Sequence, residues 1–361
     1  AMFIGVAVIV WVLTFAQLGG TKYTEKISKI GLIGGIAVPI LILNIGLVAY
    51  FMTGGKSQID LSVKSLVPDF SDVKTLVIFA SFILAYMGVE ASASHVHELK
   101  EPNKMYPEVM IMLTVLTICL DAVGGLAVAT TLPAKTLNGN LSYGVIETFE
   151  NIYVNHFGEQ YSWIVFVVAL LLALGVFAEI SAWIVGPSKA LLEAAYDGIL
   201  PARFEETNKN GVSVFTIMLQ AVIVTIWDAV LCGSIALAGG SDSSVGYLTA
   251  IGLTVVIYLA AYVLFFLGYF VLILRKRDMK REFHIPGGRA VKLVVAAVGL
   301  FMTVVTLIIS FFPSSKLTAS DNRVYQIVLI VCFIVSMAAP LIIYSNRHRW
   351  SSSGKATSDE K

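Results

Sequence analysis

Four carboxylates interrupt long apolar runs of this sequence: Glu90, Asp121, Glu179 and Asp228. An acidic side chain inside hydrocarbon is costly and normally faces a bundle interior or a water-filled cavity. Such positions are therefore where the chain can bind a polar substrate or carry a proton. Asp121 and Asp228 each fit a proton site or a buried neutral side chain, and the sequence leaves both readings open.

Glu90 lies in an unusual segment that reads Tyr86-Met87-Gly88-Val89-Glu90-Ala91-Ser92-Ala93-Ser94. A glycine followed by a glutamate and by small or hydroxyl residues is a poor continuous helix, so the segment predicts an unwound stretch near Gly88. A break exposes carbonyl groups on one side and N–H groups on the other, which together can hold a zwitterion. The alternative is a small-residue packing face with Glu90 near the interface.

Two further pairs of side chains have the i, i+4 spacing that places both members on one helix face. Glu179 with Trp183 sets a carboxylate beside an indole, a combination that can line an amino-acid path. Glu179 can instead pair with another helix for folding. Tyr258 with Tyr262 lies in mid-span, where a hydroxyl needs an internal partner or water, and we expect this pair to line a cavity.

Composition defines the elements that position these residues, because 57% of the chain is hydrophobic and only 14% is charged. Apolar runs of about 20 residues cross about 30 Å of hydrocarbon as helices. We expect an all-α, polytopic membrane helix bundle, with one transport domain of about nine spans over residues 1–346 and a disordered cytoplasmic tail over 347–361. The runs lie at about 1–16, 30–52, 73–94, 106–131, 161–185, 213–236, 245–274, 290–312 and 324–345.

Basic residues are distributed unevenly among the connections. Those at 17–29, 95–105, 186–212 and 275–292, with the tail from 346, hold 19 of the 25 Lys and Arg residues. The positive-inside rule places these segments and the C-terminus in the cytoplasm, and residue 1 outside. Nine spans that start outside predict an odd number of preceding spans, so we expect the chain to be a fragment.

Several function classes find no support in the sequence. The net charge is +1, and no basic stretch is interleaved with aromatic residues, so a nucleic-acid partner is not expected. The motifs HExxH, GxSxG, GxxxxGK[ST] and CxxC are all absent, which disfavours the common enzyme classes. We expect no enzyme activity and no bound cofactor, and we expect the lipid bilayer as a partner.

The same residues carry a family resemblance. Gly88-Val89-Glu90-Ala91-Ser92-Ala93, followed by Glu101-Pro102 and Tyr106-Pro107, resembles the broken sixth helix and following loop of the APC superfamily. Trp183-Ile184-Val185-Gly186-Pro187-Ser188 and Asp197-Gly198-Ile199-Leu200-Pro201 resemble the eighth helix and its cytoplasmic exit. The resemblance implies twelve helices with the five-plus-five inverted repeat of the LeuT-like fold. This chain would hold the end of the fourth helix through the twelfth and lack the first three.

Within that superfamily the chain is most similar to bacterial glutamate/γ-aminobutyrate antiporters of acid resistance, through Gly19-Gly20-Thr21-Lys22-Tyr23-Thr24 and Val67-Pro68-Asp69-Phe70-Ser71. This resemblance implies exchange of external glutamate for internal γ-aminobutyrate across the inner (plasma) membrane, with functional coupling to a cytoplasmic glutamate decarboxylase. The substrate-binding residues that it implies are Gly88, Val89, Glu90, Glu179, Trp183, Tyr258 and Tyr262.

Two alternatives stand beside this hypothesis. One is an APC carrier for another substrate, a cationic amino acid or a polyamine, and the other is a membrane scaffold or sensor that transports nothing. Glutamate exchange carries one further expectation, because Glu90 and Glu179 repel an anionic substrate and no Lys or Arg lies in the middle of a span. We therefore expect exchange to be favoured by acid.

Overall fold

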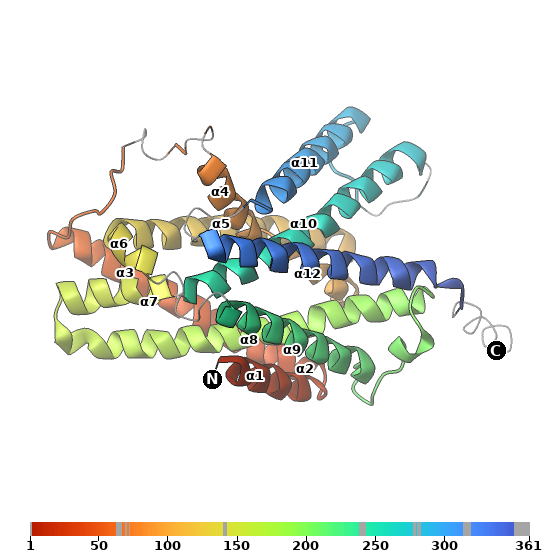
Figure 1. Ribbon diagram of the computed structural model, residues 1–361, viewed down its shortest axis with the longest axis horizontal. Helices are drawn as coiled ribbons and strands as arrows, with labels where there is room; N and C mark the ends of the chain where they lie inside the picture. The colour runs from red at the N-terminus through yellow and green to blue at the C-terminus, as the bar shows by residue number, and fades with distance from the viewer. Residues whose placement is uncertain are drawn as a thin grey trace. The chain divides into compact units, whose positions relative to one another are not determined.

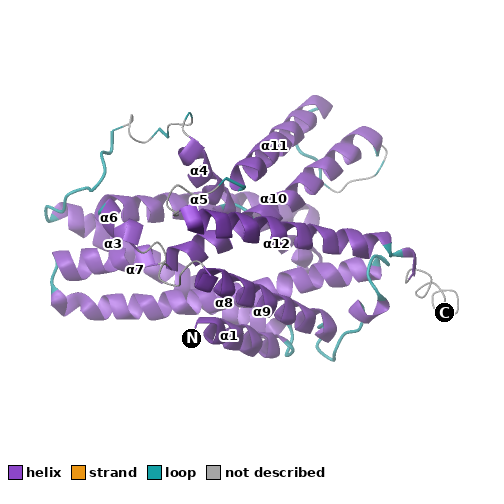
Figure 2. Ribbon diagram, in the orientation of Figure 1, coloured by secondary structure: helices purple, strands orange, loops and turns teal. Residues whose placement is uncertain are grey.

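The structure is a computed structural model, and in the residues that it describes the chain is helical and contains no β-strand (Figures 1 and 2). These residues are 2–62, 67–68, 71, 73–139, 143–237, 243–276, 279, 283–312 and 319–349. Most of the predicted disordered tail, residues 350–361, lies outside them.

Eight described segments are helical, long and apolar enough to cross a membrane. The first predicted span, at about 1–16, forms a shorter apolar helix of 16 residues, α1. The α-helices are α1 Met2–Gln17, α2 Thr21–Ile30, α3 Val38–Met52, α4 Val73–Ala85, α5 Pro102–Thr131, α6 Ala134–Gly139, α7 Gly144–Phe149, α8 Ser162–Tyr196, α9 Val214–Leu237, α10 Ser243–Arg275, α11 Arg289–Ser310 and α12 Ala319–Ser345. Two π-helical segments, Gly31–Ala37 and Glu150–His156, and three 3₁₀ segments, Val89–Glu98, Glu159–Tyr161 and Ala202–Phe204, complete the described helices.

The chain divides into two compact units. The first unit comprises residues 1–66, 118–233 and 341–361, and the second comprises residues 67–117 and 234–340. Both are discontinuous in sequence, so each unit unites segments that are far apart in the chain. The predicted site residues are divided between them: Gly88, Val89, Glu90, Tyr258 and Tyr262 belong to the second unit, and Glu179 and Trp183 to the first.

A close helix crossing organises the first unit. The π-helical segment Gly31–Ala37 continues from α2 into α3 and packs against α8. A Cβ atom added at Gly35 would overlap the backbone of Gly175, and one at Gly31 would overlap the side chain of Ala178. Small residues on both helices therefore allow the backbones to approach closely, which is how helices associate where the hydrophobic effect cannot drive them together.

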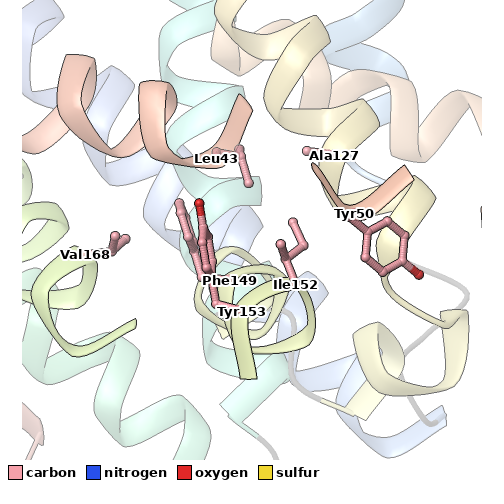
Figure 3. Close-up of a cluster of buried hydrophobic side chains, with 7 residues drawn as sticks. All are labelled: Leu43, Tyr50, Ala127, Phe149, Ile152, Tyr153 and Val168. Atoms are coloured by element: carbon pink, nitrogen blue, oxygen red, sulfur yellow. The ribbon is translucent and has the colours of Figure 1, made fainter. Parts of the chain in front are cut away.

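Beside this crossing lies a cluster of buried side chains that joins α3, α5, α7, the segment 150–156 and α8 (Figure 3). Tyr153 reaches α3, where its hydroxyl donates a hydrogen bond of 2.7 Å to the carbonyl oxygen of Ile42. Its ring lies against Gly46, where a Cβ atom would come within 2.6 Å of the phenolic oxygen. Burial raises the pKa of Tyr153, so the phenol remains a donor at physiological pH. The cluster contains Leu43, Tyr50, Ala127, Phe149, Ile152, Tyr153 and Val168.

The helix α8 differs from the prediction at its C-terminal end. The apolar run ends at 185 and a connection was expected from 186, whereas α8 continues through Pro187 to Tyr196. Proline has no N–H group, so the carbonyl oxygen of Trp183, four residues earlier, loses its helical partner. The side-chain amide of Gln220 in α9 donates to that oxygen at 2.9 Å. The helix can therefore pass the proline without leaving a carbonyl unsatisfied.

In the second unit α10 packs against both α4 and α11. The α10 residues Leu253, Val256 and Leu259 are buried. A Cβ atom at Gly299 of α11 would overlap the ring of Phe266 in α10, so these two helices also meet at a small residue. Because α4 ends against this helix pair, the position at which α4 stops determines what α10 can contact.

Candidate functional site

The third predicted span is broken where the sequence analysis expected it. The helix α4 ends at Ala85, and the chain resumes as a 3₁₀ helix at Val89. Gly88 between them has φ 103° and ψ −9°, a left-handed conformation that favours glycine. The N–H of Ala91 donates to the carbonyl oxygen of Gly88 at 3.0 Å, so the new helix starts at the break. The predicted interruption near Gly88 is therefore confirmed.

Glu90 folds back over this break. Its Oε2 accepts a hydrogen bond of 3.0 Å from the N–H of Gly88 and a second, short one from the hydroxyl of Tyr262. The Gly88 N–H also lies 3.4 Å from the Tyr262 hydroxyl oxygen. All three residues are partly buried. The structure thus unites one backbone N–H, one phenol and one carboxylate, drawn from the break and from α10.

The tyrosine pair of α10 is aligned as its spacing predicts. The ring centroids of Tyr258 and Tyr262 are 6.4 Å apart, with the ring planes inclined by 35°. Tyr262 also contacts the rings of Phe265 and Phe266 one turn later. Packing by these aromatic rings restricts the rotamer of Tyr262, which keeps its hydroxyl directed at Glu90. Tyr262 thus positions another residue, Glu90.

Hydrogen bonds also fix the far side of the break. The hydroxyl of Ser92 donates to the carbonyl oxygen of Val89 at 2.6 Å. The hydroxyl oxygen of Ser92 also lies 3.3 Å from the hydroxyl of Tyr106 and 3.6 Å from the sulfur of Met110, both in α5. The 3₁₀ segment that carries Glu90 is therefore attached to α5 as well as to α10. In the sequence Tyr106 is only part of a motif, and its contact with Ser92 was not predicted.

A cavity of about 250 Å³ lies between α4, α10 and α11, and Tyr262 forms part of its wall. Residues Tyr86 and Met87 line it immediately before the break. Among the described residues that line it there is no Lys, Arg, Asp, Glu or His, and the polar side chains are those of Tyr and Thr, which carry hydroxyl groups. The remaining lining residues are Ile83, Leu259, Phe266, Gly299, Met302, Thr303 and Thr306. Sequence reasoning missed the α11 members, which have no ionisable group or recognisable motif.

Glu179 and Trp183 lie on α8 in the first unit, with the i, i+4 spacing that places them on one face. The Glu179 side chain is exposed, and that of Trp183 is 37% exposed. Among the described residues, no ion pair or hydrogen bond to the Glu179 side chain supports the alternative that Glu179 pairs with another helix for folding. The role of Gln220 was not predicted from the sequence. The available signal was Pro187, because a proline four residues after Trp183 leaves the Trp183 carbonyl without its helical donor.

The two second-rank acids have different environments. Asp121 of α5 is exposed. Asp228 of α9 is partly buried, and its Oδ1 lies 3.6 Å from the sulfur of Cys232 in the same helix. Its Oδ2 is buried without a hydrogen-bond partner among the described residues. Both predicted alternatives, a proton site or a buried neutral acid, therefore remain open for Asp228. Asp121 does not fit a buried acid, because its side chain is exposed.

The chemistry available at the break is recognition of a small molecule that carries both charges. The first N–H groups of a helix have no partner within it, and a carboxylate fits such an end. Glu90 supplies a negative charge that can meet an ammonium group. In the part of the chain that the structure describes, no group of three His, Cys, Asp or Glu side chains could hold a metal ion.

Comparisons with known proteins find similarity to amino-acid transporters. The family profile described as amino acid permease matches residues 1–333. Two proteins of Lactococcus lactis, from strains IL1403 and MG1363, are each 46% identical over 342 residues and are named glutamate/γ-aminobutyrate antiporters. The match covers 95% of this chain and 66% of each relative, so the chain spans just under two thirds of their length. An uncharacterized transporter of Legionella pneumophila is 29% identical over 340 residues, which is 94% of this chain and 70% of that protein.

The left-handed conformation of Gly88 yields a first prediction. Gly88→Leu forces a side chain into that conformation at a cost of about 1–3 kcal/mol, so the break should distort and solute exchange should be lost. The matched control is Gly268→Leu in α10, where a new Cβ atom meets nothing within 4 Å and the backbone is helical. Exchange by both variants is measured in liposomes after their melting temperatures are compared. Normal exchange by the Gly88 variant would contradict a role for the break.

Proposed function

This chain belongs to the amino acid permease family and is a multi-pass membrane protein, and from this premise we propose that the protein exchanges external glutamate for internal γ-aminobutyrate. It acts as a secondary carrier and not as an enzyme. The two Lactococcus lactis relatives bear the name of this exchange, at 46% identity over nearly all of the present chain. About a third of each relative is not covered by the match. The substrates of the whole protein are therefore stated here as a proposal.

One observation carries the proposal: the helix broken at Gly88, with Glu90 and Tyr262 gathered at the break. Broken membrane helices bind substrates in secondary transporters because the freed backbone groups are satisfied by the ligand. Glutamate and γ-aminobutyrate both carry an ammonium and a carboxylate group. A site that offers N–H and O–H donors beside a carboxylate matches both charges. Val89 belongs to this site through its backbone.

Transport follows by alternating access, in which one part of the carrier rocks against the other around the substrate. Strict exchange results if the empty carrier reorients slowly. Import of glutamate and export of its decarboxylation product would let a cytoplasmic glutamate decarboxylase consume one proton in each cycle. The carrier is thereby coupled in function to that enzyme. Glu179 and Trp183 line the path of the substrate in this scheme.

The proposal includes a location and an orientation. The protein resides in the inner (plasma) membrane with its C-terminus in the cytoplasm. The excess of Lys and Arg in the connections at 17–29, 95–105, 186–212 and 275–292 supports this orientation. Acid resistance is the physiological role that would follow, since the paired decarboxylation removes cytoplasmic protons.

Exchange by the full-length protein in liposomes is the direct test. Vesicles loaded with γ-aminobutyrate should take up labelled glutamate at least about tenfold faster than vesicles loaded with buffer, because the loaded carrier reorients and the empty one does not. Uptake in both kinds of vesicle at an equal rate would contradict obligatory exchange. Exchange of arginine or a polyamine in place of glutamate would favour the alternative carrier, and no exchange of any solute would favour a scaffold.

The acidic residues predict the pH dependence of this exchange. A fully anionic glutamate meets repulsion from Glu90 and Glu179, so exchange should be several-fold faster near pH 5 than near pH 7, where about 0.2% of glutamate side chains are protonated. Glu179→Gln shifts this profile if the protein's carboxylate is responsible, and leaves it in place if the titration of the substrate is. Initial rates for both proteins are measured at fixed ionic strength. A rate independent of pH in both would contradict the electrostatic account.

A further inference from the structure

Glu90 itself holds the donors that a substrate carboxylate needs. We propose that its carboxylate is an internal competitor, which a substrate displaces from the Gly88 N–H and the Tyr262 hydroxyl on binding. This inference rests on the proposed function, since it concerns the same site. It adds that Glu90 selects substrates that bear both a carboxylate and an ammonium group.

The contacts at the break support displacement. A carboxylate oxygen accepts from two donors that belong to different elements, the backbone at Gly88 and the side chain of Tyr262 in α10. Hydrogen bonds to an ionised acceptor are about twice as strong as neutral ones, so the donors are well satisfied without a ligand. Any ligand that uses the same donors must supply an acceptor of similar strength. Another carboxylate meets that requirement.

Displacement leaves Glu90 without its donors, and this determines selectivity. A partly buried carboxylate that has lost its partners is strongly destabilising unless a cation replaces them. A zwitterion supplies that cation, since its carboxylate takes the two donors while its ammonium group pairs with Glu90. A simple carboxylate would leave Glu90 unpaired, and a simple amine could not satisfy the donors. The charges balance only for a ligand that carries both groups.

An independent observation is the cavity beside Tyr262. Its volume of about 250 Å³ exceeds the roughly 150 Å³ of an engineered cavity that binds benzene, so a short aliphatic chain fits. Its lining contains no charged side chain and adjoins the break through Tyr86 and Met87. The cavity can receive the uncharged methylene groups of a ligand whose carboxylate lies at Tyr262 and whose ammonium group lies at Glu90.

The test compares three ligands on the full-length protein: γ-aminobutyrate, butyrate, which lacks the amine, and butylamine, which lacks the carboxylate. Affinities are taken from ligand-dependent shifts in melting temperature, which do not require transport. Glu90→Ala removes the competitor, so the affinity for butyrate should rise about tenfold. The affinity for γ-aminobutyrate should not rise in parallel, because this ligand also loses its ammonium partner. The preference for γ-aminobutyrate over butyrate should therefore fall about tenfold or more. Butylamine should bind neither protein appreciably.

A second background separates displacement from simple charge repulsion. In Tyr262→Phe one donor is missing, so removal of Glu90 should improve butyrate binding by less than it does in the native background. An equal improvement in both backgrounds would overturn the proposal in favour of general repulsion. Unchanged butyrate binding with weakened γ-aminobutyrate binding in Glu90→Ala would also overturn it, since Glu90 would then be only an ammonium partner.

Matched controls lie in the same unit: Glu108→Ala on α5 and Tyr247→Phe on α10 remove exposed groups of the same types. Neither should change the preference among the three ligands. Glu90→Gln serves if the alanine variant melts early, because a neutral amide competes less strongly than a carboxylate. Absence of glutamate exchange by the unaltered protein, with the expected ligand pattern intact, would contradict the proposed function alone.

Discussion

A helix that crosses hydrocarbon has no water to replace a lost hydrogen bond, so each interruption of the helix must supply its own partners. The interruption at Gly88 meets this constraint with side chains. Glu90 and Tyr262 satisfy the N–H of Gly88, and Ser92 satisfies the carbonyl of Val89. The candidate site depends on the broken backbone, and these residues satisfy the groups that the break frees. In the proposed mechanism, substrate recognition replaces one set of hydrogen-bond partners with another.

Pro187 meets the same constraint in the first unit, with a different solution. Its missing N–H leaves the carbonyl of Trp183 without a helical donor, and Gln220 supplies one from the neighbouring helix. Here the substitute partner is a side chain that links two helices. At Gly88 the substitute is the carboxylate of Glu90, and we propose that a ligand carboxylate replaces it. An interrupted helix therefore does not by itself indicate a binding site. The identity of the substitute partner distinguishes the two cases, an amide from Gln220 at Pro187 and a carboxylate from Glu90 at Gly88.

The sequence predicted the class, the spans and the break for physical reasons. Long apolar runs must be helices in hydrocarbon, and a glycine beside Glu90 in such a run is difficult to explain as continuous helix. It did not predict that α8 passes Pro187, because the compensating Gln220 lies more than thirty residues away and contacts Trp183 only after folding. The hydrogen bond between Tyr262 and Glu90 could not be predicted for the same reason. The i, i+4 spacing places Tyr258 and Tyr262 on one helix face but does not indicate which residue that face contacts. The role of Glu179 stays a prediction, since its side chain is exposed and it belongs to the other unit than Glu90.

The most direct measurement is an experimental structure of the full-length protein with γ-aminobutyrate bound. This account predicts an interrupted helix at Gly88, with the ligand carboxylate within hydrogen-bond distance of the Gly88 N–H and of the Tyr262 hydroxyl. Glu90 should have left both donors and should lie beside the ligand's ammonium group. A ligand bound elsewhere while Glu90 remains on Gly88 and Tyr262, or a continuous helix through Gly88, would contradict it.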